Sequence, residues 1–135
     1  MRDQPAPVRS WHAVVAARDP ARLNDLLADD VVFRSPAVYT PQEGKALTRH
    51  YLACALVVLG PTLRYGAEWY DEGSAVLEFE ADLDGVFVQG VDMLRWNDDG
   101  QLTSFTVLVR PLRGLQKLIE LMARELTGGA SEARA

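Results

Sequence analysis

One carboxylate, Asp92, lies in a largely apolar stretch, residues 90–96, that ends at the turn sequence Asn-Asp-Asp-Gly. Alternate side chains of a β-strand share a face, so Asp92 falls in one row with Leu94, while Val91 and Met93 make the opposite row apolar too. An ionised carboxylate in a strand covered on both faces is unfavourable unless it is hydrogen-bonded, paired with a cation or protonated. The sequence therefore predicts that Asp92 either has a stabilising structural partner or is a functional residue of a binding or catalytic site.

Two roles for Asp92 remain open at this point. In a structural role, the carboxylate would cap backbone N–H groups at a bulge near Gly90 or pair with a cation such as Arg110. In a functional role, it would face a pocket and hold or protonate an oxygen atom of a ligand, since perturbed carboxyl groups gather at functional sites. Tyr51 is a candidate partner, because a buried tyrosine hydroxyl needs a hydrogen bond.

The other reactive side chains give weaker signals. His12 is expected on the exposed side of its helix, beside Arg9 and Ser10. His50 and Cys54 have the i, i+4 spacing of metal ligands, but two ligands do not make a zinc site. Cys54 lies among apolar neighbours, which is typical of an inert buried thiol. The sequence therefore predicts no metal and no cofactor.

The composition narrows the class of protein. The chain has 135 residues, 48% of them hydrophobic, which predicts a single domain over residues 1–127 and a disordered tail over 128–135. Its 19 acidic and 14 basic residues give a net charge of −5, which argues against nucleic acid and anionic membrane as partners. A single cysteine and the lack of a long apolar run favour the cytoplasm.

Helices are predicted where apolar residues recur at spacings of three and four. The first covers about residues 8–18, and a second, short helix begins at Asp19-Pro20, which is a helix start signal, and ends at Asp29-Asp30. A third helix of about four turns ends at Gly60-Pro61. Pro111 opens the last helix, whose leucine-rich face extends to residue 126.

Most of the chain between residues 62 and 110 has period two, which is typical of strands. A short strand at 31–33 stops before Ser35-Pro36, because proline cannot donate to a strand ladder. The later strands are predicted at 62–69, 75–82, 88–96 and 102–110. In the first of these, Tyr65 and Trp69 share one row.

These elements predict one α+β domain. Its curved mixed sheet wraps as a cone around three N-terminal helices, and a C-terminal helix follows. The inside of such a cone is apolar and offers room for a ligand. The side chains predicted to line it are Phe33, Tyr51, Trp69, Phe79, Leu94, Phe105 and Val107.

The chain resembles the nuclear transport factor two-like superfamily, whose fold is also called cystatin-like, and especially its SnoaL-like members, the polyketide-cyclase and ketosteroid-isomerase-like proteins. The resemblance covers about residues 8–112 and is carried by residues 27–33 with Ser35-Pro36, by Gly44-Lys45 and by residues 90–96 with their Asp-Gly turn. It implies a cone that binds hydrophobic molecules, with acid–base chemistry in many members but no particular reaction.

Comparison with ketosteroid isomerases implies a role for three residues. Asp92 matches the aspartic acid that stays protonated in an apolar site and donates a hydrogen bond to the developing oxyanion. The general base of those enzymes, an aspartate before a proline at the end of the first strand, falls on Ser35. Their tyrosine donor falls on Trp11, which offers an indole N–H. The resemblance thus implies a catalytic site of Asp92, Ser35 and Trp11 that lacks the usual base.

The sequence as a whole predicts a protein that binds a small hydrophobic molecule, with Asp92 as hydrogen-bond donor or acid. If the protein is an enzyme, it is of isomerase, cyclase or hydrolase type, with an unknown substrate. The alternative is a non-catalytic ligand carrier or a dimeric assembly module in which Asp92 is structural. The resemblance and the two apolar rows of the Asp92 strand predict a homodimer.

Overall fold

The computed structural model describes residues 3–134, and the side chains of residues 3–127. The elements in chain order are α1 (Ala6–Ala17), the 3₁₀ turn η1 (Pro20–Arg22), α2 (Leu23–Leu26), β1 (Leu27–Arg34), β2 (Gln42–Glu43), α3 (Lys45–Leu59), β3 (Arg64–Tyr70), β4 (Ser74–Leu83), β5 (Val86–Trp96), β6 (Leu102–Arg110) and α4 (Leu112–Arg134). This order confirms the α+β class predicted from the sequence.

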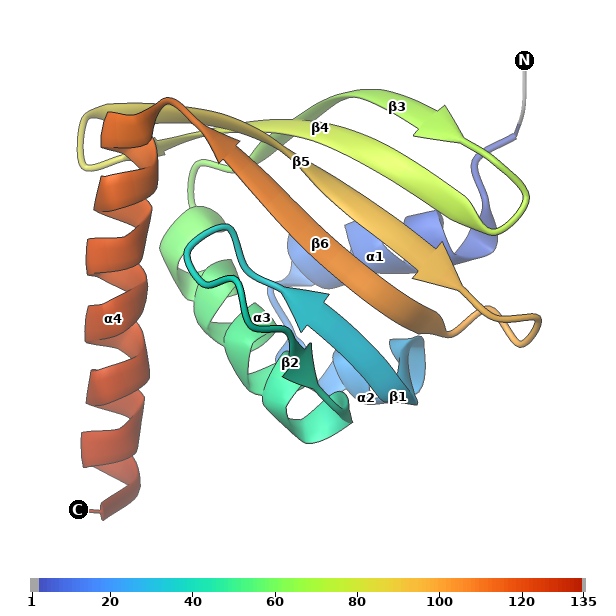
Figure 1. Ribbon diagram of the computed structural model, residues 1–135, viewed down its shortest axis with the longest axis horizontal. Coiled ribbons are helices and arrows are strands. Elements are labelled where there is room, and N and C mark those ends of the chain that lie inside the picture. The colour runs from blue at the N-terminus through green and yellow to red at the C-terminus, as the bar shows by residue number, and fades with distance from the viewer. Residues whose placement is uncertain (1–2, 135) are drawn as a thin grey trace.

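The strands form one six-stranded sheet in the order β2-β1-β6-β5-β4-β3. The pair β1 and β6 is parallel and the other pairs are antiparallel, so the sheet is mixed. Figure 1 shows the sheet curving over α1, α2 and α3, with α4 running down beside α3 at the edge of the domain. The predicted curved mixed sheet on three N-terminal helices is confirmed.

The core lies between the inner face of the sheet and the helices. In β4, Ala75, Leu77, Phe79 and Ala81 are all at most 3% exposed, which confirms the period-two pattern of this strand. From α1, the predicted face of Val8, Trp11 and Val14 is buried against the same core. The remaining buried aliphatic and aromatic residues of this cluster include Leu23, Leu27, Val31, Leu52, Leu56, Leu94, Leu102 and Phe105.

A bulge in β3 changes which of its side chains face the core. Tyr65 pairs with Phe79 of β4, but the next regular pair is Glu68 with Leu77, so the register shifts between Tyr65 and Glu68. Paired residues of antiparallel strands share a face, and the extra residue of a bulge moves later side chains to the other face. Glu68 therefore joins Tyr65 on the inner face, and Trp69 lies on the outer face, 56% exposed. The prediction that Trp69 lies inside was wrong for this reason.

Several element bounds differ from the prediction. Asp19 caps η1 by accepting a hydrogen bond from the backbone N–H of Ala21 at 3.0 Å, as its position before Pro20 predicts. The second helix then ends at Leu26, and β1 begins already at Leu27, which pairs with Leu102 of β6. Local periodicity cannot show this parallel pairing, because the two strands are far apart in the sequence.

The C-terminal helix α4 is assigned through Arg134, whereas a tail over 128–135 was predicted to be disordered. The side chains of 128–135, and the backbone of residue 135, lie outside the described residues, so the predicted disorder stays a prediction. Among the described residues, no helix is both long and apolar enough to cross a membrane.

Candidate functional site

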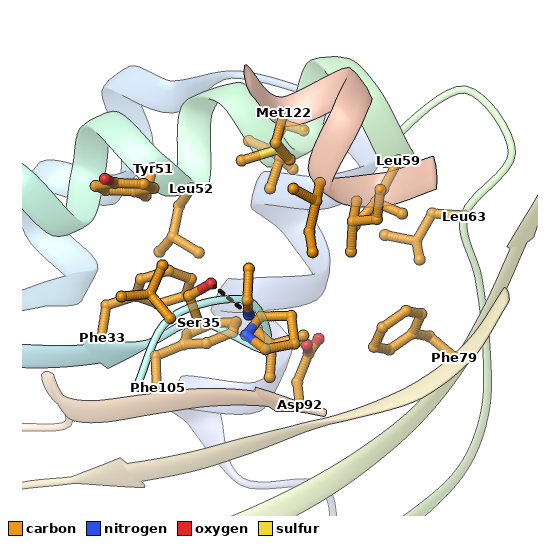
Figure 2. Close-up of a pocket in the computed structure, with 18 of the residues that line it drawn as sticks. Phe33, Ser35, Tyr51, Leu52, Leu59, Leu63, Phe79, Asp92, Phe105 and Met122 are labelled. Atoms are coloured by element: carbon orange, nitrogen blue, oxygen red, sulfur yellow. Dashed lines mark hydrogen bonds between the residues drawn. The ribbon is translucent and has the colours of Figure 1, made fainter. Parts of the chain in front are cut away.

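A cavity of about 230 Å³ lies between the inner face of the sheet, α3, α4 and the loop after β1. Figure 2 shows how side chains from all four regions surround it. The lining residues with polar atoms are Trp11, Ser35, Tyr51, Tyr65 and Asp92, and the remaining lining side chains are apolar. Asp92 is the one carboxylate among the described residues of the wall, and no lysine or arginine is found there.

The sheet register places Asp92 on this wall. Asp92 pairs with Leu77 of β4 on one side and with Val107 of β6 on the other, so the three side chains share the inner face. Its residue exposure is only 5%. The carboxyl group therefore belongs to the row of core side chains, although it ends at the cavity.

A chain of two hydrogen bonds holds the carboxyl group of Asp92. The Tyr65 hydroxyl donates to Oδ2 of Asp92 at 2.5 Å, and the indole N–H of Trp11 donates to the Tyr65 hydroxyl at 2.8 Å. Hydrogen bonds to an ionised oxygen are short and strong, and a chain of them polarises each member. The Trp11–Tyr65–Asp92 chain thus links α1, β3 and β5 and fixes one oxygen of the carboxyl group.

Tyr65 does not bond the other oxygen, Oδ1. Among the residues whose side chains are described, the only fully enclosed side-chain polar atom without a partner is Oγ1 of Thr48, so Oδ1 is not both enclosed and unpartnered. Asp92 is one of the residues that line the cavity.

Burial raises the pKa of Asp92 from 3.8 to about 7, because loss of water disfavours the charged form. Hydrogen bonding from Tyr65, and then from Trp11, favours the charged form and offsets part of this effect. Burial also raises the pKa of Tyr65 well above its usual value, and the charge of Asp92 adds to the rise. Near pH 7, Asp92 is therefore present in both forms, while Tyr65 stays protonated and can donate.

Most of the sequence matches one family, since residues 8–105 match the SnoaL-like domain. The chain belongs to the SnoaL-like family. No curated protein sequence gives a significant match to the chain.

Solved structures agree with this family. A steroid delta-isomerase from Pseudomonas aeruginosa is 37% identical, with a TM-score of 0.89 and 93% of each chain covered. An uncharacterized protein with a cystatin-like fold from Silicibacter pomeroyi is 25% identical, with a TM-score of 0.86 over 96% of this chain and 91% of that chain. A hypothetical protein with a ketosteroid isomerase-like fold from Catenulispora acidiphila, in complex with trimethylamine, is 17% identical, with a TM-score of 0.65 over 84% of this chain and 91% of that chain. The last likeness concerns the fold alone.

The structure brings the three residues implied by the SnoaL-like resemblance to one cavity. Asp92, Ser35 and Trp11 all line it. Ser35 lies just beyond the end of β1, where its Oγ accepts a hydrogen bond from the backbone N–H of Ala37 at 3.0 Å. Trp11 donates to the hydroxyl of Tyr65, which in turn bonds Asp92. Their roles in binding or catalysis stay predictions.

Five of the seven side chains predicted to line the pocket do so, namely Phe33, Tyr51, Phe79, Phe105 and Val107. Trp69 does not, because the β3 bulge turns it outward. Leu94 does not either, because it is 1% exposed within the hydrophobic core and does not reach the cavity. Period two correctly placed Leu94 on the inner face, but it does not separate core from cavity wall.

The predicted partners of Asp92 were wrong. Tyr51 stacks on Phe33 with ring centroids 5.9 Å apart. The hydrogen bond to Asp92 that was predicted for Tyr51 is made by Tyr65. Arg110 donates to Gln89 at 3.0 Å instead of pairing with Asp92. The β4–β5 register runs without interruption past Gly90, so there is no bulge there.

Sequence reasoning missed Tyr65 and the contribution of α4. Tyr65 has the same signal as Tyr51, an inner-row hydroxyl that needs a partner, but the choice between them depends on strand order. In α4, the lining residues are Leu118, Ile119, Met122, Ala123 and Leu126. Their helical spacing predicts an apolar face, and only the fold shows that this face closes a cavity.

Proposed function

We propose that the protein binds a small, largely apolar molecule in the cavity and that Asp92 holds an oxygen atom of this molecule by a hydrogen bond. The observation that carries the proposal is a buried carboxyl group that lines an apolar cavity, with Oδ2 bonded to Tyr65. A protonated carboxyl group donates one hydrogen bond, which suits a carbonyl or hydroxyl oxygen.

The wall of the cavity favours a neutral ligand. A carboxylate or phosphate would find no cation among the described lining residues, and burial of an unpaired charge is unfavourable. The volume of about 230 Å³ favours a compact molecule, since pockets for drug-sized ligands span roughly 300–1,000 Å³. A larger ligand would extend beyond the cavity.

If the ligand is a substrate, Asp92 is proposed to assist at its carbonyl or hydroxyl as hydrogen-bond donor or acid. The 37% identical steroid delta-isomerase makes steroid isomerisation the first reaction to assay. Ser35 favours a second candidate, a carrier that binds such a molecule without turning it over, because a serine hydroxyl is a poor base. Both versions are expected to act in the cytoplasm.

The affinity for a 3-ketosteroid is expected to fall about tenfold between pH 5.5 and pH 8.5, because the ionised form of Asp92 cannot donate to the ketone. In Asp92→Asn, which keeps an amide donor but does not titrate, the affinity is expected to be independent of pH. Isothermal titration calorimetry at both pH values measures this. Asp98→Asn, which removes an exposed carboxylate in the turn after β5, is the control and should behave as wild type.

A wild-type affinity that is independent of pH and equal to that of Asp92→Ala would contradict a role for Asp92 in binding. Native mass spectrometry of freshly purified protein tests the proposal without assuming a steroid, since it reveals any retained molecule. The catalytic version fails if wild-type protein and Asp92→Ala turn over a Δ5-3-ketosteroid at the same rate.

We further propose that the protein is a homodimer that associates through the outer face of the sheet. Trp69 and Leu108 are 56% and 52% exposed on this face, beside Val91 and Met93. Analytical ultracentrifugation at micromolar concentration is expected to give a dimer, and Leu108→Glu is expected to give a monomer of unchanged stability. A wild-type monomer under these conditions would contradict the proposal.

A further inference from the structure

A second polar cluster lies behind Tyr65, away from the cavity wall. The carboxylate of Glu68 accepts hydrogen bonds from Nε2 of Gln4 at 3.0 Å and from the Tyr70 hydroxyl, and it bonds Nε2 of His12. The side chains of Glu68 and His12 are only 13% and 26% exposed, so His12 is not on the exposed side as the sequence predicted. Burial raises the pKa of Glu68, but the bonds from Tyr70, Gln4 and His12 outweigh it and leave the pKa below its usual value.

The bulge of β3 is what brings Glu68 to this place. Without the shift between Tyr65 and Glu68, strict alternation would put Glu68 on the outer face, opposite to Tyr65. With the shift, Glu68 pairs with Leu77, which in turn pairs with Asp92. A partly buried carboxylate and the carboxyl group of the cavity thus stand in the same cross-strand row, separated by one leucine.

Two consecutive residues of α1 hold Tyr65. The indole N–H of Trp11 donates to its hydroxyl at 2.8 Å. The His12 ring meets the Tyr65 ring edge-on, with centroids 4.8 Å apart and an angle of 80° between the planes. The ring of Phe79 makes a second edge contact with Tyr65, with ring centroids 6.2 Å apart. The direction of the Tyr65 hydroxyl therefore depends on where α1 and the His12 ring are fixed.

We propose that His12 and Glu68 are positioning residues, in which Glu68 anchors the His12 ring and the ring keeps the Tyr65 hydroxyl directed at Asp92. Neither residue lines the cavity, so both act through Tyr65. Their importance for a ligand rests on the proposed function, but their effect on Asp92 exists in the ligand-free protein and is measured there.

The test is an NMR titration of the Asp92 carboxyl carbon in the ligand-free, full-length protein. Tyr65→Phe removes the hydrogen bond that favours the ionised form, so it is expected to raise the Asp92 titration midpoint and to set the upper limit. Glu68→Gln offers one acceptor oxygen where the carboxylate offers two, so it loses part of the cluster. It is expected to raise the midpoint by roughly half a pH unit. His12→Ala, which removes the ring contact, is expected to raise it further.

For Glu68→Gln, the sign of the shift separates positioning from a plain charge effect. Removal of a negative charge near Asp92 would by itself lower the Asp92 midpoint, whereas a loosened Tyr65 raises it. A midpoint that stays constant or falls in Glu68→Gln overturns the proposal, and so does a folded His12→Ala with the wild-type midpoint. Ser10→Ala, an exposed position on the same helix, is the control and should leave the midpoint unchanged. A failure of ketosteroid binding would not affect these outcomes.

Discussion

The free energy of unfolding of the wild-type protein, compared with Asp92→Asn, is expected to fall by about 4 kcal/mol between pH 3.5 and pH 9. Below the unfolded-state pKa, the carboxyl group is protonated in both states, and its folded form has no burial penalty for charge. Between 3.8 and about 7 only the unfolded state ionises, so stability decreases as pH rises. Above the folded-state pKa the loss is complete, and the difference becomes constant.

Urea denaturation of both proteins at several pH values measures this difference, because the other titrating groups cancel in the comparison. Asp98→Asn is the matched control, since its carboxylate is exposed and its stability should run parallel to wild type at every pH. Parallel curves for wild type and Asp92→Asn would mean that the folded protein does not penalise the ionised form of Asp92.

This expected penalty bears on the role of Asp92. Its cross-strand neighbours in the row, Leu77 and Val107, are both aliphatic. Replacing a buried ionisable group by an apolar one of similar size is often neutral or stabilising. The expected penalty therefore supports the proposed binding role of Asp92 over a purely structural one.

Much of the fold could be predicted because its signals are local. The apolar face of α1, the alternation of β4 and the turns between the later strands each follow from a few neighbouring residues. The β3 bulge has no such signal, because it depends on how Tyr65 and Glu68 pair with β4. That one shift accounts for the wrong placement of Trp69 and for the unexpected burial of Glu68.

The candidate site was predictable where a residue conflicts with its surroundings. Asp92 is such a residue, because burial of a carboxylate in an apolar strand is unfavourable without a partner or a function. Tyr65 is not, since an aromatic side chain in a strand agrees with its neighbours, and its bond to Asp92 crosses β4 between them. The part of α4 that closes the cavity was also hidden, because the same apolar face would cover a filled core.

Ser35→Asp is expected to raise the isomerisation rate of a Δ5-3-ketosteroid by roughly 10²–10⁴-fold over wild type, the usual contribution of a positioned general base. Ser35 lines the cavity together with Asp92, and in the ketosteroid isomerases that the chain resembles an aspartate occupies its position before the proline. An aspartate can also accept the hydrogen bond that Ser35 takes from the backbone N–H of Ala37, so the loop can keep its conformation.

The gain is expected mainly between about pH 5 and pH 7, where the introduced carboxylate is ionised and Asp92 is still largely protonated. In this window the new base takes a proton from the carbon next to the ketone and returns it to the far end of the double-bond system, while Asp92 donates to the developing oxyanion.

The absorbance of the conjugated product measures the rate of the reaction. Ser35→Asn, of the same shape as the introduced aspartate but without a base, should stay at the wild-type rate, and addition of Asp92→Ala, which has no donor, to Ser35→Asp should remove most of the gain. Equal rates for Ser35→Asp and Ser35→Asn would show that the cavity does not hold the steroid between these two positions, and would favour a carrier over an isomerase that has lost its base.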